Sequence, residues 1–312
     1  MRTFRTFNHR CRTPPMPLCL GEVQHCSFNV MLFCCYNELM TKVSISPTNR
    51  IKEYEMNKGK KPIYVAVSSQ KGGIGKSTVT TVLANYLHNV AGYDVGVLDC
   101  DHPQHSILGS RNRELQRIQE DGRLKAQLCE ALRKTGKGVF IIMDATPMSA
   151  VRQAESLIGK EPLDILFFDM PGTLQSQGVL TTLAAMDYIF IPVSADPYVT
   201  ESALQFASIF RDRLMDTGAA RTKEIVLFWT MMDKRERTDI YDAYTHAIHK
   251  MGFRILDATL PDSKRFRREL SDSQKSALRS TLTPPDNAVL KGSGIRELAQ
   301  EIINIINEEQ EV

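Results

Sequence analysis

Short apolar runs alternate with longer amphipathic stretches along most of the chain. The runs are rich in Val, Ile, Leu and Phe, which is typical of strands buried on both faces. We predict such strands over residues 63–69, 95–99, 138–143, 163–169, 188–193 and 224–230. The amphipathic stretches favour helices over residues 76–90, 110–135, 199–215, 239–251 and 294–308. This alternation predicts an α/β fold: a doubly wound, mainly parallel sheet with helices on both faces.

The first part of the chain does not follow this pattern. Residues 1–55 show neither helical nor strand periodicity and contain a cluster of prolines. Two explanations stay open, a disordered tail or a natural start at Met56. We therefore predict an unstructured extension over residues 1–55 and a single α/β domain over residues 56–312.

Charge and cysteine content set further limits on function. Residues 1–55 contain seven Lys or Arg and four Asp or Glu, so the formal net charge of +3 lies in this segment. The rest of the chain is neutral, and any nucleic-acid surface on it must be local. Only Cys100 and Cys129 lie in the predicted domain, which favours a reducing cytoplasm. No apolar run approaches the roughly 18 residues of a membrane-spanning helix.

A glycine-rich loop joins the first predicted strand to the first predicted helix. Phosphate must approach backbone N–H groups closely there, and glycine permits this approach at the start of a helix. Lys76 is placed to contact the β- and γ-phosphates, and the Ser77 hydroxyl is placed to bind Mg²⁺. The sequence therefore predicts a P-loop NTPase that binds ATP and Mg²⁺. Its expected phosphate-binding residues are Gly72, Gly73, Ile74, Gly75, Lys76, Ser77 and Thr78.

Carboxylates end two of the predicted strands. Asp99 ends the second strand and Asp101 lies two residues further on, while Asp169 ends the fourth strand. The carboxyl ends of parallel strands form the edge where α/β proteins bind ligands. A carboxylate at this edge can orient a water molecule or hold hydrated Mg²⁺. Asp99 and Asp169 are therefore candidate metal-binding residues together with Ser77.

The segment Lys71-Gly72-Gly73-Ile74-Gly75-Lys76-Ser77-Thr78 resembles the deviant-Walker ATPases of the ParA and MinD group. This resemblance implies that Lys71 reaches the nucleotide of a second subunit in an ATP-dependent homodimer. It also implies that Asp101 positions the attacking water, although the inserted His102 leaves the choice between Asp99 and Asp101 open. Lys71, Lys76 and Asp101 are thus the expected catalytic residues.

Segments further along the chain extend the resemblance. The segment that begins at Thr230 and the Leu260-Pro261 pair are similar to segments near the adenine in ParA proteins. They imply ATP contacts by Met232, Asp233 and Pro261. Residues 282–285 and 291–294 resemble the ParA-like TraA proteins of conjugative transposons.

Two sequence features bear on related classes of protein. The chain ends in an acidic segment, which is unlike a basic membrane-targeting helix, so no membrane partner is expected. No Cys-x-x-Cys is present, and on this ground an iron–sulfur carrier of the same superfamily is not expected.

A basic cluster provides the candidate nucleic-acid surface. Lys264, Arg265, Arg267 and Arg268 lie close together in the sequence, with Lys234, Arg235 and Arg237 upstream. A solvated basic face is the alternative interpretation of the same residues.

The resemblance as a whole implies an ATPase that partitions or positions DNA, in plasmid maintenance or conjugative transfer. Its expected partners are nonspecific DNA and a stimulating protein, either ParB-like or from a transfer system. DNA binding would place this cytoplasmic protein on the nucleoid. Two alternatives are a small-molecule enzyme similar to dethiobiotin synthetase and a nonhydrolysing nucleotide-dependent adaptor.

Overall fold

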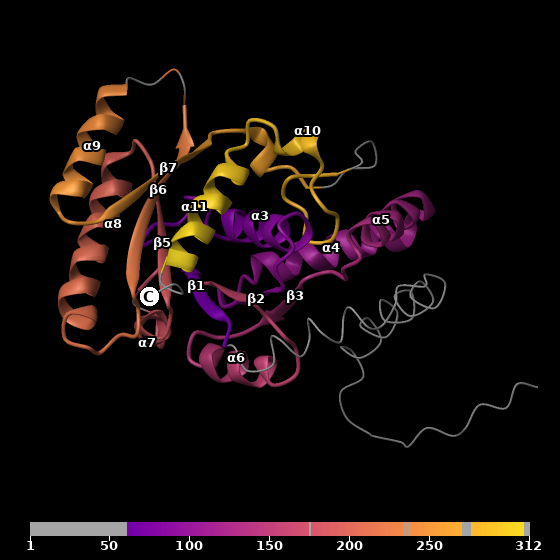
Figure 1. Ribbon diagram of the computed structural model, residues 1–312, viewed down its shortest axis with the longest axis horizontal. Coiled ribbons are helices and arrows are strands. Elements are labelled where there is room, and N and C mark those ends of the chain that lie inside the picture. The colour runs from indigo at the N-terminus through magenta and orange to yellow at the C-terminus, as the bar shows by residue number, and fades with distance from the viewer. Residues whose placement is uncertain (1–60, 175, 234, 236–237, 270–275, 309–312) are drawn as a thin grey trace, which may run out of the picture. The chain divides into compact units, whose positions relative to one another are not determined.

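The computed structural model describes residues 61–174, 176–233, 235, 238–269 and 276–308 (Figure 1). These residues belong to one unit of the chain, Pro47–Val312. The extension and the boundary predicted at residue 55 lie outside the described residues. None of the helices in the described ranges combines the length and apolar character that a membrane crossing needs.

A seven-stranded sheet runs through the described part of the chain, and its strand pairs are all parallel. The strand order is β3-β2-β4-β1-β5-β6-β7, so β1 is central, β2, β3 and β4 lie on one side of it, and β5, β6 and β7 follow in sequence order on the other. The predicted fold class is therefore confirmed. The strands are β1 (Ile63–Val67), β2 (Val95–Asp99), β3 (Ile141–Asp144), β4 (Ile165–Asp169), β5 (Tyr188–Val193), β6 (Glu224–Met232) and β7 (Arg254–Pro261).

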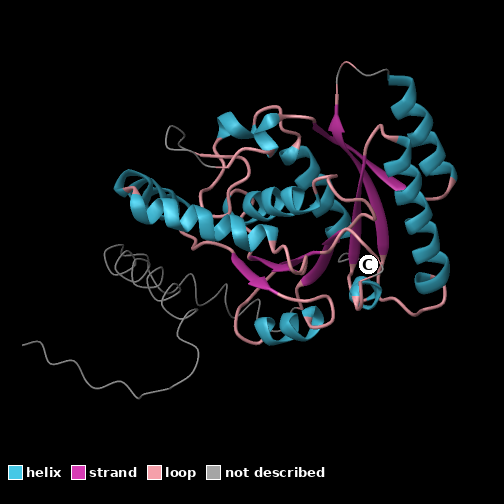
Figure 2. Cartoon of the chain, turned by 180° about the vertical axis from the view of Figure 1, so that it is seen from behind, coloured by secondary structure: helices cyan, strands magenta, loops and turns pink. Residues whose placement is uncertain are grey.

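Helices cover both faces of this sheet, and Figure 2 shows them from behind. The α-helices are α3 (Lys76–Asn89), α4 (Ser106–Glu120), α5 (Gly122–Thr135), α6 (Ala150–Ile158), α7 (Val179–Ala184), α8 (Pro197–Phe210), α9 (Thr238–Lys250), α10 (Asn287–Leu290) and α11 (Ile295–Glu308). A π-helical turn, η1 (Arg211–Met215), extends α8, and a 3-10 turn, η2 (Lys264–Phe266), follows β7.

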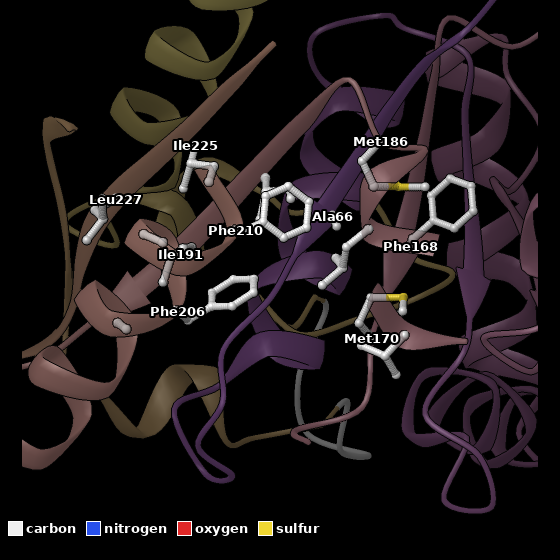
Figure 3. Close-up of a cluster of buried hydrophobic side chains, with 14 of the residues drawn as sticks. Ala66, Phe168, Met170, Met186, Ile191, Phe206, Phe210, Ile225 and Leu227 are labelled. Carbon is white, nitrogen blue, oxygen red and sulfur yellow. The ribbon is translucent and has the colours of Figure 1, made fainter. Parts of the chain in front are cut away.

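Alternate residues of the central strands belong to two separate apolar clusters. Ala66 of β1 and Phe168 of β4 belong to the cluster under α6, α7, α8 and α9 (Figure 3). Their neighbours Val65 and Phe167 belong to the cluster under α3 and α11. Both faces of the sheet are therefore buried, which explains why the sequences of the strands are continuous apolar runs.

Two local features differ from the sequence prediction. The helix predicted over residues 110–135 is two helices, because Asp121 ends α4 and caps α5 by accepting hydrogen bonds from Arg123 N and Leu124 N. The second difference is β7, an edge strand that the sequence analysis missed. Its Asp257 N and Ala258 N donate to the Glu301 carboxylate of α11 at 3.0 and 2.8 Å.

Candidate nucleotide-binding site

The predicted phosphate loop lies between β1 and α3, at the carboxyl end of the central strand. Gly73 (φ +80°) and Gly75 (φ +90°) have left-handed backbones, which side-chain-bearing residues rarely adopt. Gly75 is the N-cap of α3, and no side chain caps this helix start. The first N–H groups of α3 and its helix dipole therefore suit an anion. Ile74 is buried at 3% exposure and anchors the loop.

The Lys76 side chain lies along the inside of the loop. Its Nζ donates to Lys71 O at 3.3 Å, and the residue is 8% exposed. Burial lowers the pKa of Lys76, while the charges of Asp169 and Asp101 act in the opposite direction. A Cβ added at Gly172 would lie 3.1 Å from Nζ. The lysine, Gly172 and two carboxylates therefore surround one position, where the lysine can contact a terminal phosphate.

Asp169 is a buried carboxylate at the end of β4, with 0% exposure. Neither of its oxygens has a hydrogen-bond partner of normal geometry among the described residues. Burial raises the pKa of Asp169 to about 7; the Ser77 hydroxyl lowers it, and the charge of Asp99 raises it further. A buried carboxylate whose nearest donor is a single hydroxyl is costly unless a cation compensates for the missing hydrogen bonds. Ser77 and Asp169 therefore fit a hydrated Mg²⁺.

Asp99 has a different environment, although it is equally buried. Its Oδ2 accepts hydrogen bonds from Ile107 N and Leu108 N, both at 2.9 Å, and so caps the start of α4. Burial raises the pKa of Asp99, and these two bonds partly offset that effect. Nothing in the sequence around Asp99 indicated this role, because the capped helix begins several residues later.

Asp101 lies in the loop between β2 and α4 and is half-buried. Its backbone oxygen accepts a hydrogen bond from His105 N at 2.8 Å. Its carboxylate is close enough to Lys76 to affect the pKa of that lysine. Asp101 therefore lies on the phosphate side of the site. Its carboxylate, unlike that of Asp99, does not cap α4.

The beginning of the loop is the exposed side of the site. Lys71 is exposed, and its backbone N–H donates to Ser69 Oγ at 3.2 Å. Gln70, which stands where many P-loops begin with glycine, accepts a hydrogen bond from Ser202 Oγ of α8 at 3.0 Å. The loop is thus attached to α8, while the Lys71 side chain remains at the surface.

The residues expected near the adenine lie at the ends of β6 and β7. Met232 pairs in register with Pro261 and packs against the apolar cluster that contains Ala66. The Asp233 carboxylate is held by Arg235 Nη2 at 2.6 Å, and this contact lowers the pKa of Asp233 to about 2. Sequence reasoning missed Met231, whose Cε lies 3.9 Å from the position of a Cβ added at Gly75.

Much of the basic cluster is engaged in contacts within the chain. Arg265 Nη1 donates to Lys291 O at 2.6 Å, and Arg267 Nη2 contacts Asp262 Oδ1 at 2.8 Å. Lys264 and Arg268 are exposed beside them. The upstream residues Lys234 and Arg237 lie outside the described residues. The cluster therefore does not present four freely available positive charges.

Comparisons with known proteins find similarity to P-loop NTPases over part of the chain. Residues 61–195 match the model of the ParA family, which is described as a NUBPL iron-transfer P-loop NTPase. MinD from Aquifex aeolicus has a similar structure, with a TM-score of 0.51 and 14% sequence identity over 78% of this chain and 97% of that chain. The fold is of the ParA and MinD type. These matches do not test the closer resemblance to TraA proteins.

Two curated relatives share part of the sequence. The iron-sulfur cluster carrier protein of Methanococcus maripaludis is 32% identical over 174 residues, which cover 52% of this chain and 56% of that protein. The protein of the same name from Rickettsia conorii is 32% identical over 119 residues, which cover 34% of this chain and 35% of that protein. The chain thus spans less than two thirds of either relative.

These matches correct the predicted function. The expectation of DNA partitioning or conjugative transfer is wrong, because the family model is described by iron transfer and both relatives are named iron–sulfur cluster carriers. The same names overturn the exclusion of iron–sulfur carriers. That exclusion rested on the missing Cys-x-x-Cys alone.

Proposed function

We propose that this chain binds ATP and Mg²⁺ at residues 72–78 and hydrolyses the bond between the β- and γ-phosphates of ATP. The observation that carries the proposal is Asp169, a buried carboxylate that receives no hydrogen bond from a backbone N–H of the described residues and lies beside the Ser77 hydroxyl and the Lys76 charge. Such a residue destabilises the fold when no cation is bound beside it, and it is useful as a ligand in a cation site.

Each residue of the site has a distinct task in this proposal. Ser77 and Asp169 would hold Mg²⁺, which neutralises phosphate charge when bound. Lys76 donates hydrogen bonds to the terminal phosphates and stabilises the negative charge that spreads over them during transfer. The backbone at Gly172 lies beside Lys76 and closes the position of the γ-phosphate.

The attacking water needs a carboxylate that is not otherwise used. Asp99 Oδ2 already accepts two N–H groups of α4, whereas Asp101 contributes its charge near Lys76 without that capping task. This contrast supports Asp101 as the residue that orients the water, and it makes Asp99 a positioning residue for α4.

We propose further that ATP binding produces a homodimer. Lys71 is exposed at the rim of the site, while its backbone oxygen accepts the hydrogen bond from Lys76. A side chain so placed can reach a phosphate bound to a second copy without disturbing its own loop. The resemblance to deviant-Walker ATPases supports this role.

The names of the relatives support iron–sulfur cluster transfer as the process that the ATPase serves. Among the described residues the cysteines are Cys100, which is buried, and Cys129, which is half-buried on α5. Burial raises the pKa of Cys100 well above its usual range, which disfavours the thiolate that iron requires. The described residues contain no group of three metal-binding side chains, so they do not fit a cluster and we derive no cluster-binding step from them.

Steady-state phosphate release with MgATP tests the ATPase. We expect turnover by the wild type, none by Lys76→Ala, and retained ATP with stalled hydrolysis in Asp101→Ala. Normal turnover by both variants would contradict the proposed site.

A separate experiment tests the process. The full chain is incubated anaerobically with ferrous iron and sulfide, passed through a desalting column and mixed with an apo acceptor protein. Iron that travels with the chain and then reaches the acceptor supports cluster transfer. A chain that emerges without iron contradicts it, and the ATPase result is unaffected.

A further inference from the structure

The loop between β2 and α4 carries Asp101, and the start of this loop is fixed to the sheet. Cys100 N donates to Asp169 O at 2.9 Å, which ties the first loop residue to the end of β4. Ala145 N donates to Asp99 O at 3.0 Å, which holds the end of β2 against the residue that follows β3. The chain therefore has a fixed position directly before Asp101.

His105 ties the other end of this loop to the same point of the sheet. Its ring Nδ1 lies 3.1 Å from Asp99 O, and because a carbonyl oxygen can only accept, Nδ1 carries a proton and donates. The backbone N–H of His105 donates to Asp101 O at 2.8 Å. One residue thus bonds both to the end of β2 and to Asp101, and it closes the turn that contains Asp101.

The backbone of His105 indicates that its ring is the part that matters. His105 is the N-cap of α4 and has a left-handed conformation, with φ +40° and ψ +57°. Glycine adopts this conformation readily, whereas a residue with a Cβ needs compensating contacts. The ring provides them, because it donates to Asp99 O and packs edge-on against the His102 ring, with the centroids 5.4 Å apart.

The cap that Asp99 provides for α4 does not replace this contact. Asp99 Oδ2 accepts from Ile107 N and Leu108 N, so it fixes the helix beyond the turn. The His105 ring is bonded to the sheet four residues after Asp101 and so encloses a shorter segment. A carboxylate that orients a water molecule is sensitive to small displacements, since the reacting groups must be aligned closely. The tighter closure is therefore the one that bears on Asp101.

We propose that His105 is a positioning residue for hydrolysis: the hydrogen bond from its ring to Asp99 O holds the turn that presents the Asp101 carboxylate to the attacking water. This inference rests on the proposed ATPase and on the proposed task of Asp101. His105 has no contact with ATP in this arrangement. It therefore affects the rate of the chemical step and leaves ATP binding unchanged.

The experiment measures kcat and KM for MgATP by steady-state phosphate release in the wild type and in three variants of the loop: His105→Gly, His105→Asn and Asp101→Ala. Glycine keeps the left-handed backbone and removes the ring. Asparagine also tolerates this backbone, and its amide nitrogen can donate in place of Nδ1. His246→Asn, at an exposed position of α9, is the matched control.

We expect kcat of His105→Gly to fall roughly tenfold with KM unchanged, because only the alignment of the water is lost. His105→Asn should recover most of the lost kcat, and His246→Asn should match the wild type. The melting temperature of His105→Gly should stay near that of the wild type, since glycine fits the backbone and Asp99 still caps α4.

Two results would overturn the inference while the proposed function stands. One is full turnover by His105→Gly beside a stalled Asp101→Ala, and the other is a loss in His105→Asn as large as that in His105→Gly. A rise in KM without a change in kcat would also contradict a positioning role. By contrast, normal turnover by Asp101→Ala, or none by the wild type, would overturn the proposed function and this inference with it.

Discussion

Asp99 of β2 and Asp169 of β4 are direct partners in the parallel register of the sheet, yet only Asp99 receives hydrogen bonds from backbone N–H groups. The two carboxylates are both fully buried and end neighbouring strands. Identical residues in adjacent positions therefore have opposite energetic roles. One stabilises a helix start, and the other has no backbone N–H donor among the described residues.

This contrast predicts different effects of the same truncation. Asp99→Ala should lower the free energy of unfolding by roughly 2 kcal/mol, because two buried N–H groups lose their acceptor. Asp169→Ala should leave it nearly unchanged or raise it, because a buried carboxylate without backbone N–H donors in the described part of the chain is removed. Urea unfolding without Mg²⁺ or nucleotide provides the comparison. Equal losses in the two variants would show that Asp169 has donors in solution.

Gly172→Ala tests the close approach of the backbone to Lys76. The new Cβ would lie 3.1 Å from Lys76 Nζ, which is tighter than ordinary contact, so the lysine must shift. We expect turnover to fall by roughly tenfold, because a small displacement of a catalytic group is costly. The melting temperature should stay near that of the wild type, since the flexible lysine tip can move.

Gly159→Ala is the matched control for that experiment. Its new Cβ would lie 3.8 Å from the nearest atoms, which is ordinary contact, and Gly159 follows α6 away from the loop. This variant should hydrolyse ATP like the wild type. A similar loss in both variants would mean that the effect is not specific to Lys76.

Lys71→Ala should separate nucleotide binding from dimer formation. The side chain is exposed and only its backbone takes part in the loop, so the affinity for ATP should remain close to that of the wild type. Light scattering with ATP should show a weaker dimer, and turnover should be slower. A normal ATP-dependent dimer with full turnover would contradict the proposed contact between subunits.

His88 predicts a pH dependence of stability. Val95 N donates to Nδ1 at 3.4 Å, while Nε2 lies 3.0 Å from Gly138 O and is its donor, which requires the neutral ring. Burial lowers the pKa of His88 below its ordinary value of about 6.5. The unfolded chain therefore binds the proton more readily, and stability is complete above pH 6.5 and falls as the pH drops below it.

The measurement is the melting temperature of wild type and His88→Gln between about pH 7.5 and pH 5, where histidine titrates. The wild type should lose stability toward low pH more steeply than His88→Gln, which has no titrating ring. His246→Gln, at an exposed position of α9, should retain the wild-type slope. Parallel slopes for all three proteins would mean that His88 can be protonated in the folded state.

The sequence predicted the phosphate loop and the strands around it because their chemistry is local. Glycines, a lysine and a hydroxyl stand within a few residues, directly between a strand and a helix. The break at Asp121 also had a local signal, since an aspartate before a helix is a common cap. By contrast, β7 carries Arg254 and Asp257 and lies at the sheet edge, so it does not form a continuous apolar run.

Other features depend on residues that are distant in the chain. The cap that Asp99 provides for α4 and the approach of Met231 to Gly75 exist only once the strands pair. Arg265 and Arg267 looked free in the sequence because their partners, Lys291 O and Asp262, are set by the fold. The biological process was mispredicted because a phosphate loop is common to proteins with different tasks.

The Glu301 carboxylate has a consequence for how copies of this chain can meet. It accepts hydrogen bonds from two consecutive N–H groups of the edge strand β7, Asp257 N and Ala258 N. A sheet that exposes such groups at its edge invites edge-to-edge growth and aggregation. Because α11 blocks that route in the middle of β7, the sheet of one molecule does not continue into the next there. An added strand therefore cannot pair with the N–H groups of Asp257 and Ala258.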